Sequence, residues 1–538
     1  MLGVHLDSRL TFQHHVKQVE AKAKQKINLL KCLNKSTWGA GPATARLAYT
    51  STLLPLITYG AAVWYKGEKK IEGKLASIQR NAAIQISGAF RTTQGAALEV
   101  DLHLPAMNFT LDKMGWDSVA RMASRVHSRQ MVLQADTEAR YKSPLARQVG
   151  RLKKELDEDD ILSLLDINTA FVNEPWGLVP TTHLLVGDDP AKEAHDEIVK
   201  DQHIIKIYTD GSGIDGRIGA AAVVKWEDGE TQTQKAYLGP ASKYSVFCGE
   251  AKGLEMAIEA VATTDRDTLK PVHIFVDNRG LVEAITNPTA QNGQKFIKSF
   301  HALHRLVLNP VHIHWIPSHT DIPGNDEADI AAKEVTGWRK KENECGPPET
   351  DPTPGHTRTA VVRKIKDKSF TKWWKQWNKL PRKSMHRVQS TPDIRTREKY
   401  KDLTRPLASI LIQARTGHIG LGKFLHAIKK LDHPRCRLCN NNQDQTPAHI
   451  LLNCSALDDD RIKMWESIGK KISDLRKLTG NPAMARHAAL LLLRARVLQQ
   501  FRHVDVEEQL KAVRDLDEAQ RQREEAAREK AKSKLVTM

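Results

Sequence analysis

The stretch that most constrains the fold of this chain runs from residue 203 to residue 226, HIIKIYTDGSGIDGRIGAAAVVKW. Its first half alternates β-branched and other side chains, which predicts a strand that ends at Asp210. A glycine turn at 211–213 and a second predicted strand at 218–226 follow. A carboxylate at that point would be fixed by the strand and left open to a ligand by the turn. Asp-Gly is also a common hairpin turn pair, so this stretch alone does not establish a catalytic site.

Three further acidic residues follow at places where they could meet Asp210. Glu250 lies in a helical pattern in which apolar residues recur four, seven, eight and eleven positions later, so its carboxylate shares the core-facing stripe. A charge in that position is costly unless it is paired or binds a metal. Asp277 ends a predicted strand, and Asp329 lies in a predicted helix. The four side chains could therefore converge on one edge of a sheet.

The order of these residues resembles type 1 ribonuclease H. The resemblance covers residues 204–335 and rests on Asp-Gly-Ser at 210–212, Gly-Glu at 249–250, Val-Asp-Asn at 276–278 and Trp-Ile-Pro-Ser-His-x5-Asn-x3-Asp at 315–329. It implies a ribonuclease H-like α/β domain with a mixed five-stranded sheet, flanking helices and the element order β-β-β-α-β-α-β.

The resemblance also implies roles for particular residues. The residues that match the four metal-binding carboxylates and the assisting mobile histidine are Asp210, Glu250, Asp277, Asp329 and His319. Those that match the substrate surface are Gly211, Ser212, Gly213, Asn278 and Asn325. Carboxylates suit Mg²⁺ or Mn²⁺, and two such ions about 4 Å apart can activate a water and stabilise the leaving oxygen. The family cuts the RNA strand of RNA–DNA hybrids, which requires a surface that recognises 2′-hydroxyl groups.

Two other functions compete with metal-dependent hydrolysis of hybrids. A transposase or integrase shares the fold but needs a glutamate as its last carboxylate, and Asp329 stands there. A catalytically silent, nucleic-acid-binding remnant of a retrotransposon stays open. Between 287 and 308 the chain lacks the basic helical handle of some family members, so we expect flanking segments to contribute to substrate affinity.

Charge and composition limit the partners. The 538 residues allow three or four domains, and the net charge of +18 favours a polyanionic partner. The first ten residues lack a signal-peptide pattern, and the longest apolar run, 50–65, is too short to span a bilayer. Six cysteines, three of them clustered, suggest a reducing compartment. We therefore expect an intracellular protein without a membrane partner, nuclear or cytoplasmic.

Residues 1–135 are predicted to be mostly helical. LGVxLDxxL at 2–10 and LLPLITYGAAVW at 53–64 resemble the thumb segment that follows the polymerase core in LINE-type (non-LTR) reverse transcriptases. The aromatic-Ala-Asp-Asp motif of that polymerase does not occur in the chain, so we expect no DNA synthesis. A plain helical packing domain is the alternative. Residues 136–202, with scattered prolines and charge runs, are predicted to be a connector.

A proline-rich linker is predicted at 338–360 and a basic, tryptophan-rich helical region at 361–435. Between 361 and 401 there are 14 Lys and Arg against 3 Asp and Glu, and Trp373, Trp374 and Trp377 lie among the lysines. Cations bind phosphates and aromatic rings stack on unpaired bases, which favours single-stranded nucleic acid as a second partner. Trp373 and Trp377, spaced by four residues, could equally anchor a helix to its neighbour.

Residues 436–456 contain the pattern Cys436-x2-Cys439-x9-His449-x4-Cys454. Three thiolates and an imidazole suit tetrahedral Zn²⁺. The pattern resembles the Cys-Cys-His-Cys motif near the C-terminus of LINE-type elements, which also follows an Arg-Thr-Gly-His segment, here at 415–418. Reduced thiols in a small core are the alternative. With a helical, charged tail predicted at 457–538, the chain resembles part of a retrotransposon polyprotein whose α/β ribonuclease H domain, 203–337, is flanked by mostly helical regions.

Overall fold

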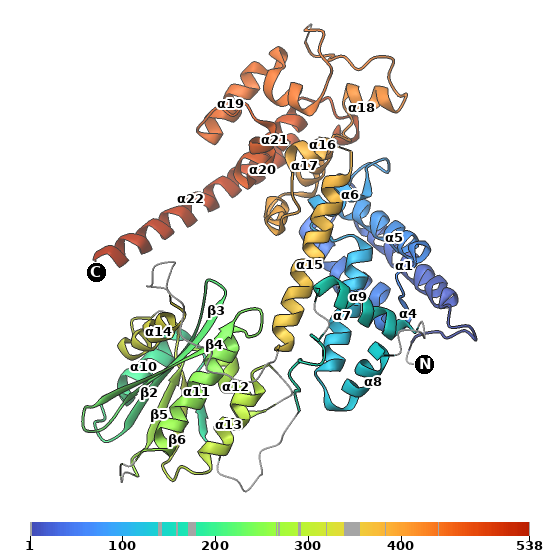
Figure 1. Ribbon diagram of the computed structural model, residues 1–538. Helices are drawn as coiled ribbons and strands as arrows, with labels where there is room; N and C mark the ends of the chain where they lie inside the picture. The colour runs from blue at the N-terminus through green and yellow to red at the C-terminus, as the bar shows by residue number, and fades with distance from the viewer. Residues whose placement is uncertain are drawn as a thin grey trace. The chain divides into compact units, whose positions relative to one another are not determined.

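The computed structural model describes residues 3–536 apart from 138–142, 158–159, 170–178, 265, 267–268, 289–291, 319, 338–355, 382–383 and 440. For residues 136–137, 384, 527 and 530–536 it describes only the backbone. The chain forms two compact units (Figure 1). One consists of Met1–Met114 together with Ser369–Met538, and the other of Gly115–Lys368.

The second unit is built on a six-stranded mixed sheet in the order β1-β6-β5-β2-β3-β4. β2, β3 and β4 form an antiparallel meander, whereas β5 runs parallel to β2, and β6 and β1 continue the parallel half. The strands are β1 Thr181–His183, β2 Ile205–Ile214, β3 Arg217–Lys225, β4 Thr231–Pro240, β5 Val272–Val276 and β6 Val311–Trp315.

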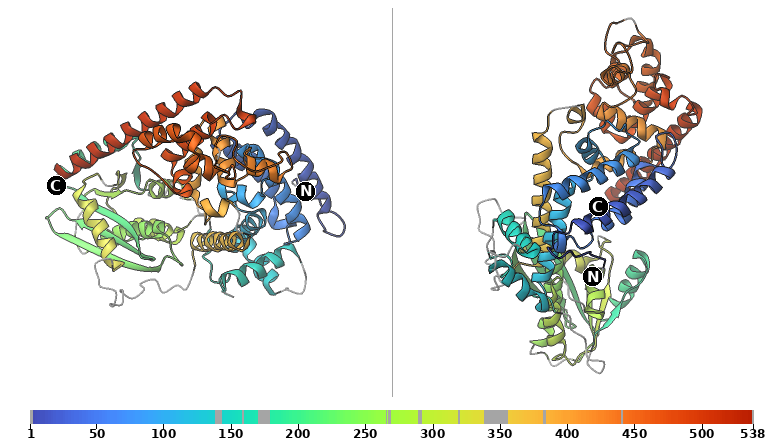
Figure 2. Two further views of the ribbon diagram at one scale, coloured as in Figure 1. Left: turned by 90° about the horizontal axis from the view of Figure 1, so that it is seen from above. Right: turned by 90° about the vertical axis from the view of Figure 1, so that its right-hand side faces the viewer.

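Helices cover both faces of this sheet (Figure 2). Ile205 and Ile207 of β2 face the helices α11, α12 and α13, whereas Tyr208 faces α10 and α14. Because successive strand residues point to opposite faces, one strand supplies both hydrophobic layers. The five helices are α10 Asp188–Ile198, α11 Val246–Ala262, α12 Arg279–Thr286, α13 Gln294–His304 and α14 Pro323–Val335. The predicted α/β class with flanking helices is confirmed.

The predicted end of the first strand at Asp210 is wrong. β2 continues through the glycines to Ile214, in register with β3 from Gly219 to Arg217, and the chain turns at Asp215 and Gly216. Both turn residues have left-handed φ values, 49° and 75°. The glycines at 211 and 213 therefore extend the strand, and Asp210 lies within the sheet.

The predicted number of strands was one too few. β1 and α10 both come from 181–198, a stretch predicted to be connector, and β1 adds to the edge of β6 with Thr181 opposite His312 and His183 opposite His314. This short strand lacks apolar alternation, so only its pairing partner identifies it. Preceding helices form a further cluster in this unit, in which Trp116 and Leu152 pack against Val361.

The first unit is helical, and its two chain segments share one core. Its N-terminal elements are α1 Gln13–Leu33, α2 Pro42–Ala48, η1 Tyr49–Leu53, α3 Leu54–Thr58, α4 Ala61–Trp64, α5 Lys69–Ser87 and α6 Gly95–Asp101. Its C-terminal elements are α16 Ser384–Val388, η2 Ile394–Tyr400, α17 Arg405–Thr416, α18 Gly422–Ala427, η3 His449–Asn453, η4 Ser455–Leu457, α19 Asp458–Ile468, α20 Leu475–Gly480, α21 Pro482–Arg494, η5 Gln499–Phe501 and α22 Val506–Val536. The division at residues 114 and 368 falls within two long helices, α7 Met107–Ala123 and α15 Arg358–Lys379; α8 Val126–Thr137 and α9 Pro144–Leu156 belong to the second unit.

A buried ion pair joins the two segments of the helical unit. Arg415 and Asp101 are both fully buried, and Arg415 Nε donates to Asp101 Oδ1 at 2.9 Å. The hydroxyl of Tyr400 donates to the other carboxylate oxygen at 2.6 Å. Removing one partner of such a pair would leave an unpaired buried charge, which typically costs about 3–5 kcal/mol. The segments 1–114 and 369–538 are thus parts of one structural unit, although the sequence suggested separate regions.

Two of the three clustered tryptophans pack in this unit. Trp373 and Trp377 are buried against Val100 and Phe109, and the Trp377 ring stacks on His386 with centroids 3.7 Å apart. Trp374 is 38% exposed. Packing thus accounts for Trp373 and Trp377, whereas Trp374 stays at the surface with its neighbouring lysines. None of the helices among the described residues combines the length and apolar character needed to cross a bilayer.

Four histidines gather on the parallel half of the sheet. His183 stacks on His314, with centroids 4.4 Å apart, and His273 stacks on both His312 and His314. His273 Nδ1 lies 3.0 Å from His314 Nε2, a hydrogen-bond distance that requires an unprotonated nitrogen on one ring. Burial, followed by the charge of the other histidines, lowers the pKa of His273 to about 4 and of His314 to about 3.

These depressed pKa values predict that acid loosens the parallel edge of the sheet. The unfolded histidines take up protons near pH 6.5 and the folded ones near pH 3–4, so their stabilisation is complete above pH 6.5 and is lost as the pH falls through the folded values. We expect His314→Phe, which keeps an aromatic ring beside Phe275, to move the acid-unfolding midpoint to lower pH. His203→Phe, at an exposed position of the same unit, is the control. Circular dichroism during acid titration measures both, and equal midpoints would contradict the prediction.

Candidate active site and metal centres

Asp210 lies in β2 opposite Ala221 of β3, one residue after the parallel pairing of β2 with β5 ends at Thr209. Its side chain is 7% exposed. Tyr208, two residues earlier, faces α14, and Asp210 points to the same face because strand side chains alternate. A carboxylate is therefore held in the second unit with little access to water.

Helix α11 approaches β2 and β3 at backbone contact. A Cβ atom on Gly211 would lie 2.2 Å from the backbone nitrogen of Glu250, and one on Gly249 would lie 2.6 Å from the carbonyl oxygen of Gly219. One helical turn later, a Cβ on Gly253 would lie 2.9 Å from the carbonyl oxygen of Ala221. No larger residue fits at Gly211 or Gly249 without moving the helix. These glycines let the helix carry Glu250 to the strand that holds Asp210.

Glu250 is the least solvated of the acidic residues at this place, with 5% of its surface exposed. Burial raises its pKa well above the ordinary range, as do the charges of Asp210 and Asp277, while hydrogen bonding to Gly211 and Asn278 acts in the opposite direction. Its Oε2 atom is buried and has no hydrogen-bond partner among the described residues. A buried oxygen without a partner is unfavourable in the protein alone and suits a cation ligand.

Asp277 completes a group of three carboxylates. It directly follows β5, next to β2 in the sheet, and one oxygen each from Asp210, Glu250 and Asp277 lie within 4.8 Å of one another. Burial raises the pKa of Asp210 to about 7, and the charges of Asp277 and Asp329 add to this effect. Hard divalent cations prefer oxygen ligands, so the donor set fits Mg²⁺ or Mn²⁺.

The comparison with known families matches this part of the chain. The family model described as RNase H covers residues 202–336. These residues form an RNase H domain. The domain contains the six-stranded sheet apart from β1, and all three clustered carboxylates.

Curated relatives are retrotransposon proteins. The chain is 29% identical over 92 residues to the retrovirus-related Pol polyprotein from type-1 retrotransposable element R1 4 of Nasonia vitripennis. The aligned part is 17% of this chain and 24% of the relative. It is 30% identical over 118 residues to the R1 2 polyprotein of the same organism, and the aligned part is 22% of this chain and 27% of that relative. A putative 115 kDa protein in element R1DM of Drosophila melanogaster is 26% identical over 18% of this chain and 10% of the relative. The chain thus matches about a quarter or less of these relatives' lengths.

Solved RNase H structures are similar to about a quarter of the chain. RNase H1 from Halobacterium salinarum is 19% identical, covers 24% of this chain and 96% of its own, and gives a TM-score of 0.21. LC11-RNase H1 in complex with an RNA/DNA hybrid is also 19% identical, with coverage of 26% and 99% and a TM-score of 0.22.

The fourth predicted carboxylate lies on α14 of the RNase H domain, outside the group of three. Asp329 is half-buried and forms an ion pair with Lys333, one turn later in the helix. The charge of Asp329 contributes to the raised pKa of Asp210, and the positive charge of Lys333 acts in the opposite direction. The sequence analysis missed Lys333, although its spacing of four from Asp329 is the signal of a helical ion pair.

The remaining predicted residues of the RNase H domain differ in their surroundings. Gly211, Ser212 and Gly213 extend β2 instead of forming a turn. The side chain of Asn278 caps α12 by accepting a hydrogen bond from the backbone N–H of Leu281 at 3.1 Å. Asn325 is buried in α14, and its Oδ1 has no hydrogen-bond partner among the described residues. His319 lies outside the described residues.

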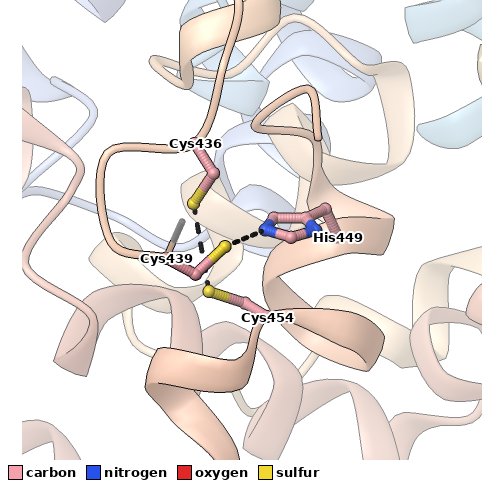
Figure 3. A group of neighbouring side chains, drawn as sticks. All are labelled: Cys436, Cys439, His449 and Cys454. Carbon is pink, nitrogen blue, oxygen red and sulfur yellow. Dashed lines mark hydrogen bonds between the residues drawn. The ribbon is translucent and has the colours of Figure 1, made fainter. Parts of the chain in front are cut away.

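A second candidate metal centre lies in the helical unit (Figure 3). Ligand atoms of Cys436, Cys439, His449 and Cys454 all lie within 4.8 Å of one another. Cys436 Sγ is 3.9 Å from Cys454 Sγ, and Cys439 Sγ is 3.3 Å from His449 Nε2. Zinc ligands at about 2.0–2.3 Å in a tetrahedron are separated by about 3.3–3.8 Å, so these distances fit Zn²⁺.

The surrounding backbone and side chains orient the four ligands. The Nδ1 atom of His449 lies 2.8 Å from Gln443 Oε1, so Nε2 faces the sulfur atoms. A hydrogen bond from the backbone of Asn441 lowers the pKa of the Cys439 thiol, which favours the thiolate that zinc binds. Cys439 and Cys454 also belong to the hydrophobic core of the unit. The site is therefore built into the packing of the C-terminal helices.

We expect about one zinc ion per purified chain and its loss in Cys436→Ser with Cys439→Ser. Because the ligands are part of the core, the double variant or a strong chelator should also lower the melting temperature of the helical unit. Elemental analysis and thermal melting measure the two effects. Cys32→Ser, at an exposed free cysteine, should change neither. Wild-type protein purified without zinc, and indifferent to added zinc, would contradict this site.

Proposed function

We propose that the chain is a metal-dependent endonuclease that hydrolyses the RNA strand of RNA–DNA hybrids, as part of a retrotransposon-derived protein. The observation that supports this most directly is the unpartnered, buried Oε2 of Glu250 beside Asp210 and Asp277. Three carboxylates so close together repel one another unless a cation lies between them. Their position in an RNase H domain and the similarity to retrotransposon polyproteins agree with this function.

The proposed ligands of two Mg²⁺ or Mn²⁺ ions are Asp210, Glu250, Asp277 and Asp329. When bound, such ions supply an activated water and stabilise the departing oxygen of a phosphodiester. Around them, the hydrogen bonds from Gly211 and Asn278 hold the Glu250 carboxylate in place. Lys333 forms an ion pair with Asp329, and we propose that this carboxylate would turn toward Asp210 to reach the ions.

Substrate contacts are proposed for the C-terminal part of β2 and the polar residues near it. Gly211, Ser212 and Gly213 present backbone to the minor groove, and Asn278 and Asn325 offer amides to 2′-hydroxyl groups. His319 is proposed to assist proton transfer or product release. For the flanking regions we propose a thumb-like role for residues 1–135 without polymerase activity. We propose 338–360 and the part of 136–202 that precedes β1 as connecting segments. The proposed regions that follow are the basic region 361–435, the zinc motif 436–456 and the helical tail 457–538.

The competing function is a catalytically silent protein that only binds nucleic acid. It shares the charge and the fold but does not need the carboxylates, so a substitution that removes one carboxylate separates the two functions. Asp326 offers a matched control, because it lies in α14 three residues before Asp329 and is exposed.

We expect Mg²⁺-dependent cleavage of a labelled RNA–DNA hybrid by the wild type and a fall of at least about a hundredfold in Asp210→Asn, since the neutral amide is a poorer cation ligand. Asp326→Asn should cut at the wild-type rate. A gel assay with hybrid, RNA duplex and DNA duplex substrates gives rate and specificity together. Equal cutting by the wild type and Asp210→Asn would exclude Asp210 from the reaction, and a wild type without cleavage would favour the silent binder.

The same cluster predicts a stability effect without substrate. At pH 8 in chelator, Asp210 is largely charged because its pKa is about 7, and it then lies beside two other carboxylates. We expect Asp210→Asn to melt several degrees above the wild type under these conditions, because it removes this repulsion. Adding Mn²⁺ should raise the melting temperature of the wild type more than that of the variant. Scanning calorimetry with and without Mn²⁺ measures both shifts; a lower melting temperature for the variant in chelator would contradict the repulsion.

A further inference from the structure

A basic pocket lies in the helical unit. It has a volume of about 860 Å³ and is formed by η2, by α20, by the start of α21 and by residues that precede these three elements. Five cationic and two acidic side chains line it. Its size falls within the range of about 300–1,000 Å³ that is typical of ligand pockets. The pocket will be called the η2–α20 pocket.

Most of the positive charge in the η2–α20 pocket is not neutralised by the protein. Arg395 is paired with Asp393, which also caps η2. In contrast, Lys470, Arg476 and Lys477 are exposed, and none of them forms an ion pair with another described residue. Three unpaired cations that face one hollow favour an anionic ligand.

Behind the pocket, the buried Arg415 adds positive charge close to the lining residue Lys399. Gln389 Oε1 accepts hydrogen bonds from both Lys399 Nζ and Arg415 Nη2, each at 3.1 Å. Two cations thus share one neutral acceptor, and of the two only Arg415 forms an ion pair with a carboxylate, that of Asp101. Burial, and then the charge of Arg415, lowers the pKa of Lys399 to about 8. An anion in the pocket would offset this charge.

The shape and lining of the pocket narrow the choice of anion. Among the lining residues there is no aromatic side chain, so the pocket offers charge and hydrogen bonds but no stacking surface for bases. A hollow of this size has room for a few nucleotides of a strand. Contacts to phosphates fix a strand without reading its sequence. Part of the lining, from Gln389 to Lys399, belongs to the strongly basic stretch of the chain.

We propose that the η2–α20 pocket binds the phosphate backbone of single-stranded nucleic acid with little sequence preference. Lys470, Arg476 and Lys477 contact successive phosphates, and Lys399 binds the phosphate that lies deepest. This binding is independent of the RNase H domain and needs no divalent cation.

The test is binding of a labelled twelve-nucleotide single strand to the full chain in chelator, followed by fluorescence anisotropy. The pocket variant combines Lys470→Gln, Arg476→Gln and Lys477→Gln. The matched control combines Lys22→Gln, Lys26→Gln and Lys31→Gln, which removes the same charge from exposed positions on α1 in the same unit. We expect the pocket variant to bind at least about tenfold more weakly. The slope of log affinity against log salt should fall by about 2, from about 0.7 for each lost contact. The control should change affinity by less than about twofold.

Further experiments distinguish a nucleic-acid strand from other anions as the ligand of the pocket. Inorganic phosphate at matched phosphate concentration and poly-glutamate should both compete poorly with the strand. Lys399→Arg should keep binding and remove the loss of affinity that the wild type shows as the pH rises through about 8, whereas Lys399→Gln should weaken binding at all pH values. Hybrid cleavage by the pocket variant should equal that of the wild type. Equal weakening in the pocket and control variants would overturn the proposal, as would efficient displacement by phosphate or poly-glutamate, or a wild type that does not bind the strand.

Discussion

The backbone contact between α11 and the strands β2 and β3 is the constraint on which the candidate active site depends. Gly211, Gly249 and Gly253 remove the side chains that would hold the helix away from the sheet. Because the helix touches the strands directly, the carboxylate of Glu250 lies close to that of Asp210 in β2. The same contact excludes water, so the acidic groups lie in a poorly screened environment. The packing of glycines thus determines both the geometry and the electrostatics of the RNase H domain.

That electrostatic state is unfavourable for the folded protein alone. Asp210, Glu250 and Asp277 share a small volume, and the pKa values of the first two are raised by burial and by mutual repulsion. Structures hold such groups together only when the surrounding packing forces them to, and such sites are often functional. In this domain the packing is the glycine contact and the parallel pairing of β2 with β5, which brings Asp277 to Asp210. A cation would turn this repulsion into attraction.

The helical unit is built from two chain segments that are separated in sequence by the whole second unit, so it needs contacts that join them. A fully buried guanidinium, Arg415, joins them through Asp101 and Tyr400, and Arg405 donates to three backbone carbonyls of the N-terminal segment. Directional bonds of this kind specify one arrangement of helices among many that bury similar apolar area. The cysteine and histidine ligands lie in the same core. Buried basic residues therefore hold this unit together, whereas other, exposed basic residues give it its surface charge.

The sequence alone determined the residue types and their order: the acidic residues at 210, 250, 277 and 329, the three cysteines and the histidine of the C-terminal motif, and the alternation that makes β2 a strand. These signals are local or have fixed spacing, so no knowledge of distant contacts is required. Only the tertiary structure decided that β2 runs past Asp210, that β1 joins the sheet, and that Trp373 and Trp377 are buried while Trp374 is not. It also decided which lysines meet in one pocket and that Lys333 pairs with Asp329. Pairing, burial and convergence depend on residues far apart in the chain, and for them the local pattern permits several outcomes with similar energies.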